Sequence, residues 1–268
     1  VVQHPDSDER LRPCRQSLFE RLLAAERAAQ RTQFTHVLRR QGRMHPDVAQ
    51  FANEFFYARE QLMCVPCQHQ TETDLGYVLP SEDALDELLK HRRVVFLPSA
   101  PCHSLQTSDK VNASEARITA DLLRRIRRFY GDRFDCHTTV GVIVPYRNQI
   151  AMIRREINRL DMPELLHISI DTVERYQGSQ RDVIIYSFTV RYGYQLDFLT
   201  SNCFVEDGHT IDRKLNVAIT RARCQMLMTG HAPLLRQNPV FAALIEFCEG
   251  MAVPPKCNAV TRSLRSRK

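Results

Sequence analysis

The sequence lacks any apolar run long enough to cross a membrane, and it lacks an export signal at its start. No run approaches the roughly 18 consecutive apolar residues that a membrane helix needs. The first residues, VVQHPDSDERLRPC, show none of the charged, apolar and small-residue zones of a signal peptide, nor an initiator methionine. We expect a cytoplasmic protein without a membrane partner, and the chain itself resembles an excised or processed piece.

A complete set of metal ligands is also missing. The nine cysteines are odd in number and scattered among apolar residues, which is typical of reduced thiols in an intracellular protein. The stretch CVPCQH places Cys64, Cys67 and His69 at a spacing that zinc could use. A structural zinc site needs four ligands, and the Cys-His pairs at 102–103 and 136–137 lack ligand-type spacing. We therefore expect no zinc and no other metal site.

Glycine is scarce, and a phosphate-binding loop is absent. The nine glycines include no G-x-x-x-x-G-K-[ST] arrangement, so the sequence predicts no such loop to hold a nucleotide triphosphate. The net charge is nevertheless +6, and arginine outnumbers lysine. Arginine stays charged and binds phosphate with two parallel hydrogen bonds. This balance is compatible with a nucleic-acid partner but does not establish one.

Short apolar runs alternate with longer helical patterns along the chain. Continuous apolar runs indicate strands that are buried on both faces, as in a parallel sheet. Such alternation predicts a doubly wound α/β domain. The expected strands are 94–97, 140–144, 167–170, 183–188 and 226–229. The expected helices are 15–30, 46–56, 82–90, 112–131, 146–160, 213–221 and 239–249.

The helix expected over 112–131 has readable ends and a row of arginines. Asn112 is the expected N-cap, Glu115 stands three positions later, and Gly131 is the expected stop. The row of arginines comprises Arg124, Arg125, Arg127 and Arg128. These side chains could bind a ligand or form a solvated face, and we expect the solvated face. Two stretches without periodicity, 66–80 and 191–210, are expected to be loops, the second either functional or disordered.

Polar residues follow two of the expected strands. Ligands of an open parallel sheet bind beyond the carboxyl ends of its strands, so these residues are candidates for a site. Pro145 follows one strand and opens a helix whose first amides would face such a ligand. After the next strand comes DTVERYQGSQRD, a polar turn containing Gly178 that suits a phosphate or a sugar. An ordinary capped connection would explain the same residues.

Five stretches carry a resemblance to a known family. They are QSLFERL, RRQGRMHPDVAQFANEFFY, VGVIVPYRNQ, ISIDTVERYQGSQRDVIIYSFTVR and RKLNVAITRAR. Their order resembles that in superfamily 1 helicases, most closely the branch of the nonsense-mediated-decay helicase and its DNA-acting relatives. The resemblance implies the second RecA-like domain, an α/β fold of three layers with a mostly parallel central sheet flanked by helices. It also implies a layout of a linker and first helix following motif III of a missing first domain (1–30), the RecA-like domain (31–250) and a basic tail (251–268).

The same resemblance assigns nucleotide contacts to matching residues. Arg43 of GRMHP and Arg221 of TRAR match two arginines that reach the γ-phosphate of ATP as arginine fingers. Gln177 and Gly178 match the turn that couples nucleic acid to nucleotide. Gln180 matches a residue near the ribose, and Arg223 is also an expected nucleotide-binding residue, so the expected nucleotide-binding residues are Gln177, Gly178, Gln180 and Arg223. ATP and Mg²⁺ would be bound mainly by the missing first RecA-like domain, which would be this chain's partner.

Three further residues match positions along a bound single strand. Thr172 matches the motif V threonine that contacts a backbone phosphate, and Pro145 and Tyr146 match the segment beside it. Contacts with phosphates give affinity without sequence preference, so single-stranded DNA and RNA are both expected partners.

Two departures from the family pattern bear on activity. Gly42 stands where relatives usually have a tyrosine that stacks on adenine, and Gln180 stands where they commonly have glutamate. The resemblance implies an ATP-dependent helicase whose isolated C-terminal motor domain is inactive for want of the phosphate-binding loop. An inactive helicase-fold binding or scaffold protein is the alternative, and a fused nuclease would have to lie outside the chain.

Overall fold

The computed structural model describes residues 17–101, 108–201, 203–206 and 209–250, and it divides the chain into two compact units, 1–39 and 40–268. The first unit contains α1 (Leu18–Ala28), which lies within the expected helix. Ser17 and Glu20 form a reciprocal capping box at its start, as a serine with glutamate three residues later predicts. The predicted basic tail, 251–268, lies outside the described residues.

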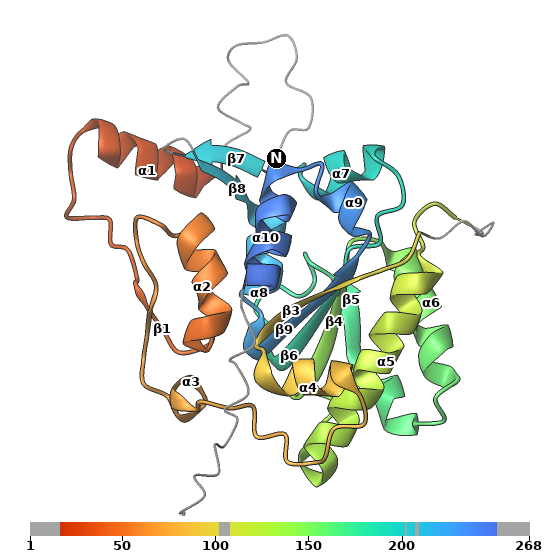
Figure 1. Cartoon of the computed structure of the whole chain (residues 1–268). Coiled ribbons are helices and arrows are strands. Elements are labelled where there is room, and N and C mark those ends of the chain that lie inside the picture. Colours follow the sequence, from red (N-terminus) through yellow and green to blue (C-terminus); the bar gives the residue numbers. More distant parts are fainter. Residues whose placement is uncertain (1–16, 102–107, 202, 207–208, 251–268) are drawn as a thin grey trace, which may run out of the picture. The chain divides into compact units, whose positions relative to one another are not determined.

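The second unit is built on a five-stranded parallel sheet in the order β3-β9-β6-β4-β5 (Figure 1). The strands are β3 (Val94–Pro98), β4 (Val140–Val144), β5 (Ser169–Thr172), β6 (Arg181–Ser187) and β9 (Ala222–Gly230). The expected α/β fold with a parallel sheet is confirmed. The strand expected at 167–170 begins two residues later, because a 3₁₀ turn, η3 (Pro163–His167), occupies the chain up to His167.

Helices cover both faces of this sheet and make the three layers (Figure 1). Alternate strand residues point to opposite faces, so Ile184 and Met226 join one core while Val183 and Leu227 join the other. Helices α2, α8 and α10 pack in the first core, and α4, α5 and α6 in the second. Their bounds are α2 (Pro46–Phe55), α4 (Ala84–His91), α5 (Ala113–Tyr130), α6 (Arg147–Asn158), α8 (Arg213–Ile219) and α10 (Pro239–Gly250); the 3₁₀ turn η2 (Gly131–Arg133) follows α5.

The two stretches expected to be loops contain short elements. The stretch 66–80 includes α3 (Gln68–Thr71), and 191–210 includes α7 (Tyr194–Leu199) and most of an antiparallel pair, β7 (Cys203–Glu206) with β8 (His209–Asp212). Elements of four to six residues span too few turns or alternations to show periodicity. A parallel pair, β1 (Arg40–Gln41) with β2 (Met63–Cys64), and α9 (Ala232–Leu235) complete the unit.

The arginine row of α5 is not the solvated face that its sequence predicts. The side chain of Arg125 is 8% exposed and donates hydrogen bonds to Asp83, Asp86 and Asp121 at 2.6–2.7 Å. Arg128 also pairs with Asp86, whose side chain is fully buried. The reason is tertiary: the start of α4 brings its carboxylates against α5, and a buried carboxylate requires a charged partner.

We predict that Arg125→Ala lowers the free energy of unfolding by about 2–4 kcal/mol, because it strips Asp86 of a buried partner. Chemical denaturation measures the change. The matched control is Arg124→Ala on the same helix turn, whose side chain is 34% exposed and pairs with Asp121. Its loss should cost less than about 1 kcal/mol. Equal losses in the two variants would contradict the structural role assigned to Arg125.

Candidate functional site

Two sequence-predicted arginines meet at the amino ends of β6 and β9. Arg43 lies in the turn between β1 and α2, and Arg221 lies between α8 and β9. The Arg43 guanidinium donates to the carbonyl of Thr220 at 3.1 Å, and Arg221 donates to the Thr220 hydroxyl at 3.3 Å. These two arginines therefore do not follow the carboxyl ends of strands, where the strand rule predicts site residues. Motif position, rather than the strand rule, predicted them.

We call the part of the sheet edge that carries Arg43 and Arg221 the arginine edge. Its electrostatics favour the binding of an anion. Within the described part of the chain, neither Arg43 nor Arg221 pairs with a carboxylate. Burial and the nearby charge of Arg43 lower the pKa of Arg221 from its ordinary value. Guanidinium remains charged at neutral pH in any protein environment, so two positive charges share this edge. An incoming anion would relieve their mutual repulsion.

The other predicted nucleotide residues are placed differently around the edge. Gln180 accepts a hydrogen bond from Arg43 Nε at 3.0 Å, so it belongs to the same group. Arg223 instead pairs with Asp182 at 2.7 Å and donates to His69 Nδ1 at 3.3 Å. Burial raises the pKa of Asp182, and the charge of Arg223 opposes that rise. The guanidinium of Arg223 is thus already occupied by groups of its own domain.

The CVPCQH stretch supports the turn that carries Arg43. His69 Nε2 donates to the carbonyl of Arg43 at 2.8 Å, which leaves its Nδ1 to accept from Arg223. Gln41 accepts from the backbone amide of Arg43 at 2.9 Å and donates to Cys64 Sγ at 3.1 Å. Among the described residues, no group of three or more histidine, cysteine or acidic side chains is arranged to hold a metal ion. No pattern in the sequence indicates this supporting role.

The predicted nucleic-acid residues gather at the opposite, carboxyl ends of the strands. Thr172 ends β5 opposite Val144, and Pro145 and Tyr146 follow directly after β4. Within the described residues, the Thr172 hydroxyl has no hydrogen-bond partner, although its backbone amide and carbonyl are bonded. Tyr146 is only 8% exposed, because the ring of Phe198 stacks over it with centroids 5.0 Å apart. The exposed ring at this position is therefore Phe198.

One short segment joins the two ends of the sheet. Residues 173–180 run from the carboxyl end of β5 back to the amino end of β6, where Arg181 lies beside Ala222. The return runs along the length of β4, which is about 13 Å at a rise of 3.3 Å per residue. Gln177 and Gly178 lie exposed in this segment, and Gly178 has a φ of +86°, a conformation that suits glycine. The segment therefore connects the predicted nucleic-acid residue Thr172 with the predicted nucleotide residues Gln177, Gly178 and Gln180.

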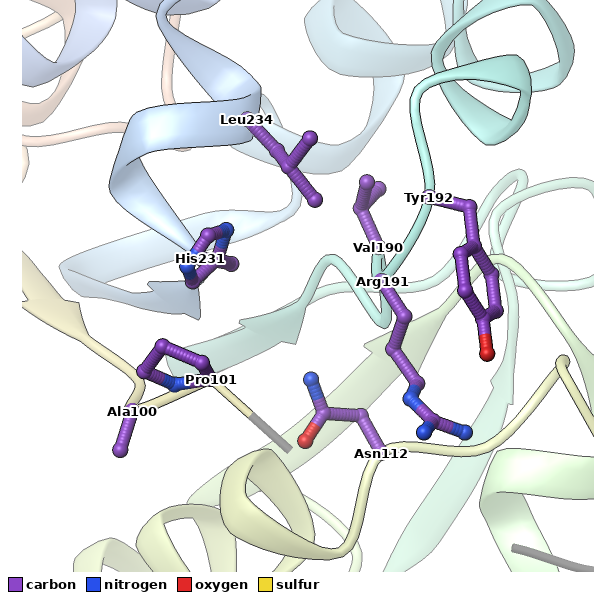
Figure 2. A pocket seen from close by; sticks show the side chains of 8 residues that line it. All are labelled: Ala100, Pro101, Asn112, Val190, Arg191, Tyr192, His231 and Leu234. Carbon is purple, nitrogen blue, oxygen red and sulfur yellow. The ribbon is translucent and has the colours of Figure 1, made fainter. Parts of the chain in front are cut away.

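A cavity of about 400 Å³ also lies at the carboxyl ends of the sheet (Figure 2). Its walls come from the chain after β3, β6 and β9 and from the start of α5, and they comprise Ala100, Pro101, Asn112, Val190, Arg191, Tyr192, His231 and Leu234. Asn112 also bonds Glu115, which accepts from the Ser187 hydroxyl and the Thr189 amide at 2.7 Å each. Complete burial raises the pKa of Glu115 to about 8. The sequence identified Glu115 only as a helix-capping residue.

Comparisons with known proteins identify the family of the chain. Residues 14–233 match the family described as AAA domain, which is most of the chain. The chain belongs to this family, as a RecA-like domain of the superfamily 1 helicases. It is 26% identical over 236 residues to Helicase SEN1 of Saccharomyces cerevisiae and 27% over 255 residues to Putative helicase MOV-10 of Gallus gallus, covering 86% and 87% of the chain. It is also 27% identical over 245 residues to DNA polymerase alpha-associated DNA helicase A of Saccharomyces cerevisiae, covering 87% of the chain.

This helicase domain corresponds to a minor part of those relatives. The match covers 9% of SEN1, 25% of MOV-10 and 33% of DNA helicase A. In the part of the helicase domain that the structure describes, no helix combines the length and apolar character needed to span a membrane.

We predict that the helicase domain becomes less stable as the pH rises from about 5 to 8. The pKa of Glu115 is about 8 in the fold and near its ordinary 4.5 when unfolded, so the fold binds the extra proton. Its stabilising effect is complete below pH 4.5 and is lost as the pH rises through 8. Unfolding measured at several pH values should show this slope, and Glu115→Gln should make it shallower. The same slope in both proteins would contradict the assignment.

Proposed function

We propose that this chain is the C-terminal motor domain of an ATP-dependent helicase. The observation that carries the proposal is the arginine edge, where Arg43 and Arg221 converge on Thr220 without a carboxylate among the described residues. Two guanidinium groups in one place suit the charge of a γ-phosphate. In the described part of the chain the edge offers guanidinium, amide and hydroxyl groups, and the phosphate-binding loop that completes the site would belong to an N-terminal RecA-like domain.

The residues of this edge would act on phosphoryl transfer by electrostatics. In the transition state, negative charge is spread over the oxygens of the transferred group, and a positioned guanidinium stabilises it. Arg221 is held in place by bonds to Val217 and Thr220, and Arg43 by bonds to Thr220 and Gln180. Mg²⁺ takes oxygen ligands and would neutralise phosphate charge from the other domain. The isolated chain would therefore be inactive.

At the other end of the sheet, the domain would grip single-stranded DNA or RNA. The hydroxyl of Thr172, which has no hydrogen-bond partner among the described residues, suits a backbone phosphate oxygen, and Pro145 follows Val144, the residue that pairs with Thr172 in the sheet. The segment 173–180 supplies a physical connection from this end to the arginine edge. Closure of the two domains on ATP, and release after hydrolysis, would then move the nucleic-acid grip with the nucleotide site.

The alternative function is an inactive helicase fold that binds nucleic acid or serves as a scaffold. Gly42 removes the aromatic ring expected at the adenine, and Gln180 gives Arg43 a neutral partner in place of a carboxylate. Neither change removes a guanidinium, which favours the active motor. The free thiols of the described cysteines support a reducing compartment, in keeping with a cytoplasmic protein.

The decisive test is nucleic-acid-stimulated ATP hydrolysis by the full-length protein that carries this chain. Arg221→Ala should lower turnover by about 10³-fold or more, because removal of an arginine finger leaves the transition-state charge unbalanced. ATP binding should persist. Arg155→Ala, an exposed arginine of α6, is the control and should leave turnover unchanged. Equal, measurable rates in wild type and the Arg221 variant would overturn the arginine-finger role of Arg221, and no hydrolysis in either would favour the inactive alternative.

A second test addresses the nucleic-acid end. Thr172→Ala should weaken binding to a single-stranded oligonucleotide by about five- to ten-fold, since one phosphate hydrogen bond is lost. Thr172→Ser keeps the hydroxyl and should bind like wild type. Fluorescence anisotropy of a labelled oligonucleotide measures both. If the alanine variant binds as tightly as wild type, Thr172 makes no contact with the strand.

A further inference from the structure

Three aromatic side chains lie exposed on one short segment at the carboxyl ends of the sheet. Tyr192, Tyr194 and Phe198 are 45%, 59% and 45% exposed, and they belong to α7 and the residues just before it. Aromatic rings usually contribute to a core, so their exposure on one segment is unusual. We call these three rings the aromatic platform. Neither the family resemblance nor the proposed function assigns them a role.

The rings of the platform are arranged in parallel pairs. Tyr192 and Tyr194 stack with centroids 5.8 Å apart and planes 9° apart. Phe198 stacks on the buried ring of Tyr146 with planes 22° apart. Lys214 lies over the ring of Phe198 and Arg191 over the ring of Tyr192, so a base that stacks on either ring takes the place of a cation or lies beside it. Every nucleobase offers a π-face for such stacking, irrespective of its identity.

The platform is also held rigid by polar contacts. The buried side chain of Gln195 accepts from the amides of Arg191 and Tyr192 at 2.8 and 3.0 Å, and it donates to the carbonyl of Asp109 at 2.8 Å. The hydroxyl of Tyr194 donates to the carboxylate of Asp109. Rings that are fixed before binding lose little conformational entropy on binding, which favours an interaction surface.

Positive charge accompanies the rings. Lys214 Nζ lies 4.2 Å from the centroid of Phe198, and the guanidinium of Arg191 lies 5.4 Å from that of Tyr192. Cations interleaved with exposed aromatic rings match the alternating phosphates and bases of a single strand. Charge therefore favours nucleic acid as the occupant.

The platform continues the proposed nucleic-acid end. Tyr146, beneath Phe198, follows β4, whose last residue lies opposite Thr172. Lys214 reaches the same region, since its amine lies 3.6 Å from the carboxylate of Glu174, two residues after Thr172. We infer that the aromatic platform stacks the bases of a single-stranded DNA or RNA whose backbone contacts Thr172. This inference rests on the proposed function and adds a base-binding surface to it.

The first experiment compares a normal oligonucleotide with an abasic one of equal length, using the 268-residue chain. Wild type should bind oligo-dT or oligo-U more tightly than the abasic strand, because only the bases can stack. The double variant Tyr192→Ala/Tyr194→Ala should lose roughly five- to a hundred-fold in affinity for the normal strand. Its affinity for the abasic strand should stay unchanged. Tyr194→Phe keeps the ring and should bind within about two-fold of wild type.

The second experiment uses the absence of tryptophan from this sequence. In Tyr194→Trp, the single indole reports on the platform alone. Oligo-dT should quench its emission, and the abasic strand at saturating concentration should not. Equal quenching by both strands would overturn base stacking at this position.

The outcomes separate this inference from the proposed function. If wild type binds both strands and the double variant binds both equally well, the platform is not a base-binding surface, while the nucleic-acid grip stands. If wild type binds neither strand, the grip itself fails, and the platform inference fails with it. Circular dichroism and thermal melting of each variant check that lost affinity does not reflect lost fold.

Discussion

The placement of both candidate sites depends on one packing contact, that of Tyr176 against Gly141. The ring of Tyr176 is buried, and its hydroxyl donates to the carbonyl of Ser169 at 3.0 Å. A Cβ at Gly141 would lie only 2.0 Å from that hydroxyl, so β4 must carry glycine there. This contact anchors the return from β5 to β6 against the sheet. It thereby fixes Thr172 at one end of the sheet and Gln180 at the other.

The parallel sheet could be predicted from sequence because its strands are short apolar runs buried on both faces. Val140–Val144 is such a run, and all its residues are buried. The arginine row of α5 could not be read in the same way. Four arginines in five positions leave open which one turns inward, and Asp86, which holds Arg125, lies 39 residues away. Tertiary pairing of this kind has no periodic signature.

The candidate site was likewise only partly readable. Motif resemblance predicts a role for Arg43 and Arg221, which are far apart in sequence but meet in the fold, whereas the rule that ligands follow carboxyl ends points to the other end of the sheet. Arg223 matched the nucleotide motif, yet its guanidinium is bound by Asp182 and His69. Tyr146 also matched, but a neighbour from α7 covers its ring. In each case a long-range contact, absent from any local pattern, decides what the side chain can touch.

The arginine edge stabilises the folded chain little, since like charges repel and burial makes Arg221 harder to keep charged. An anion that enters from outside would offset the repulsion between the two arginines, which is how the proposed function explains their arrangement. The aromatic platform also suits a partner from outside, since its rings remain 45–59% exposed in the part of the domain described. Both features sit on one closely packed sheet, and the return segment is pinned near its middle by Tyr176. A rigid body of this kind transmits a shift at one end to the other without local rearrangement. In the proposed motor, closure on the nucleotide would therefore displace the nucleic-acid end as a unit.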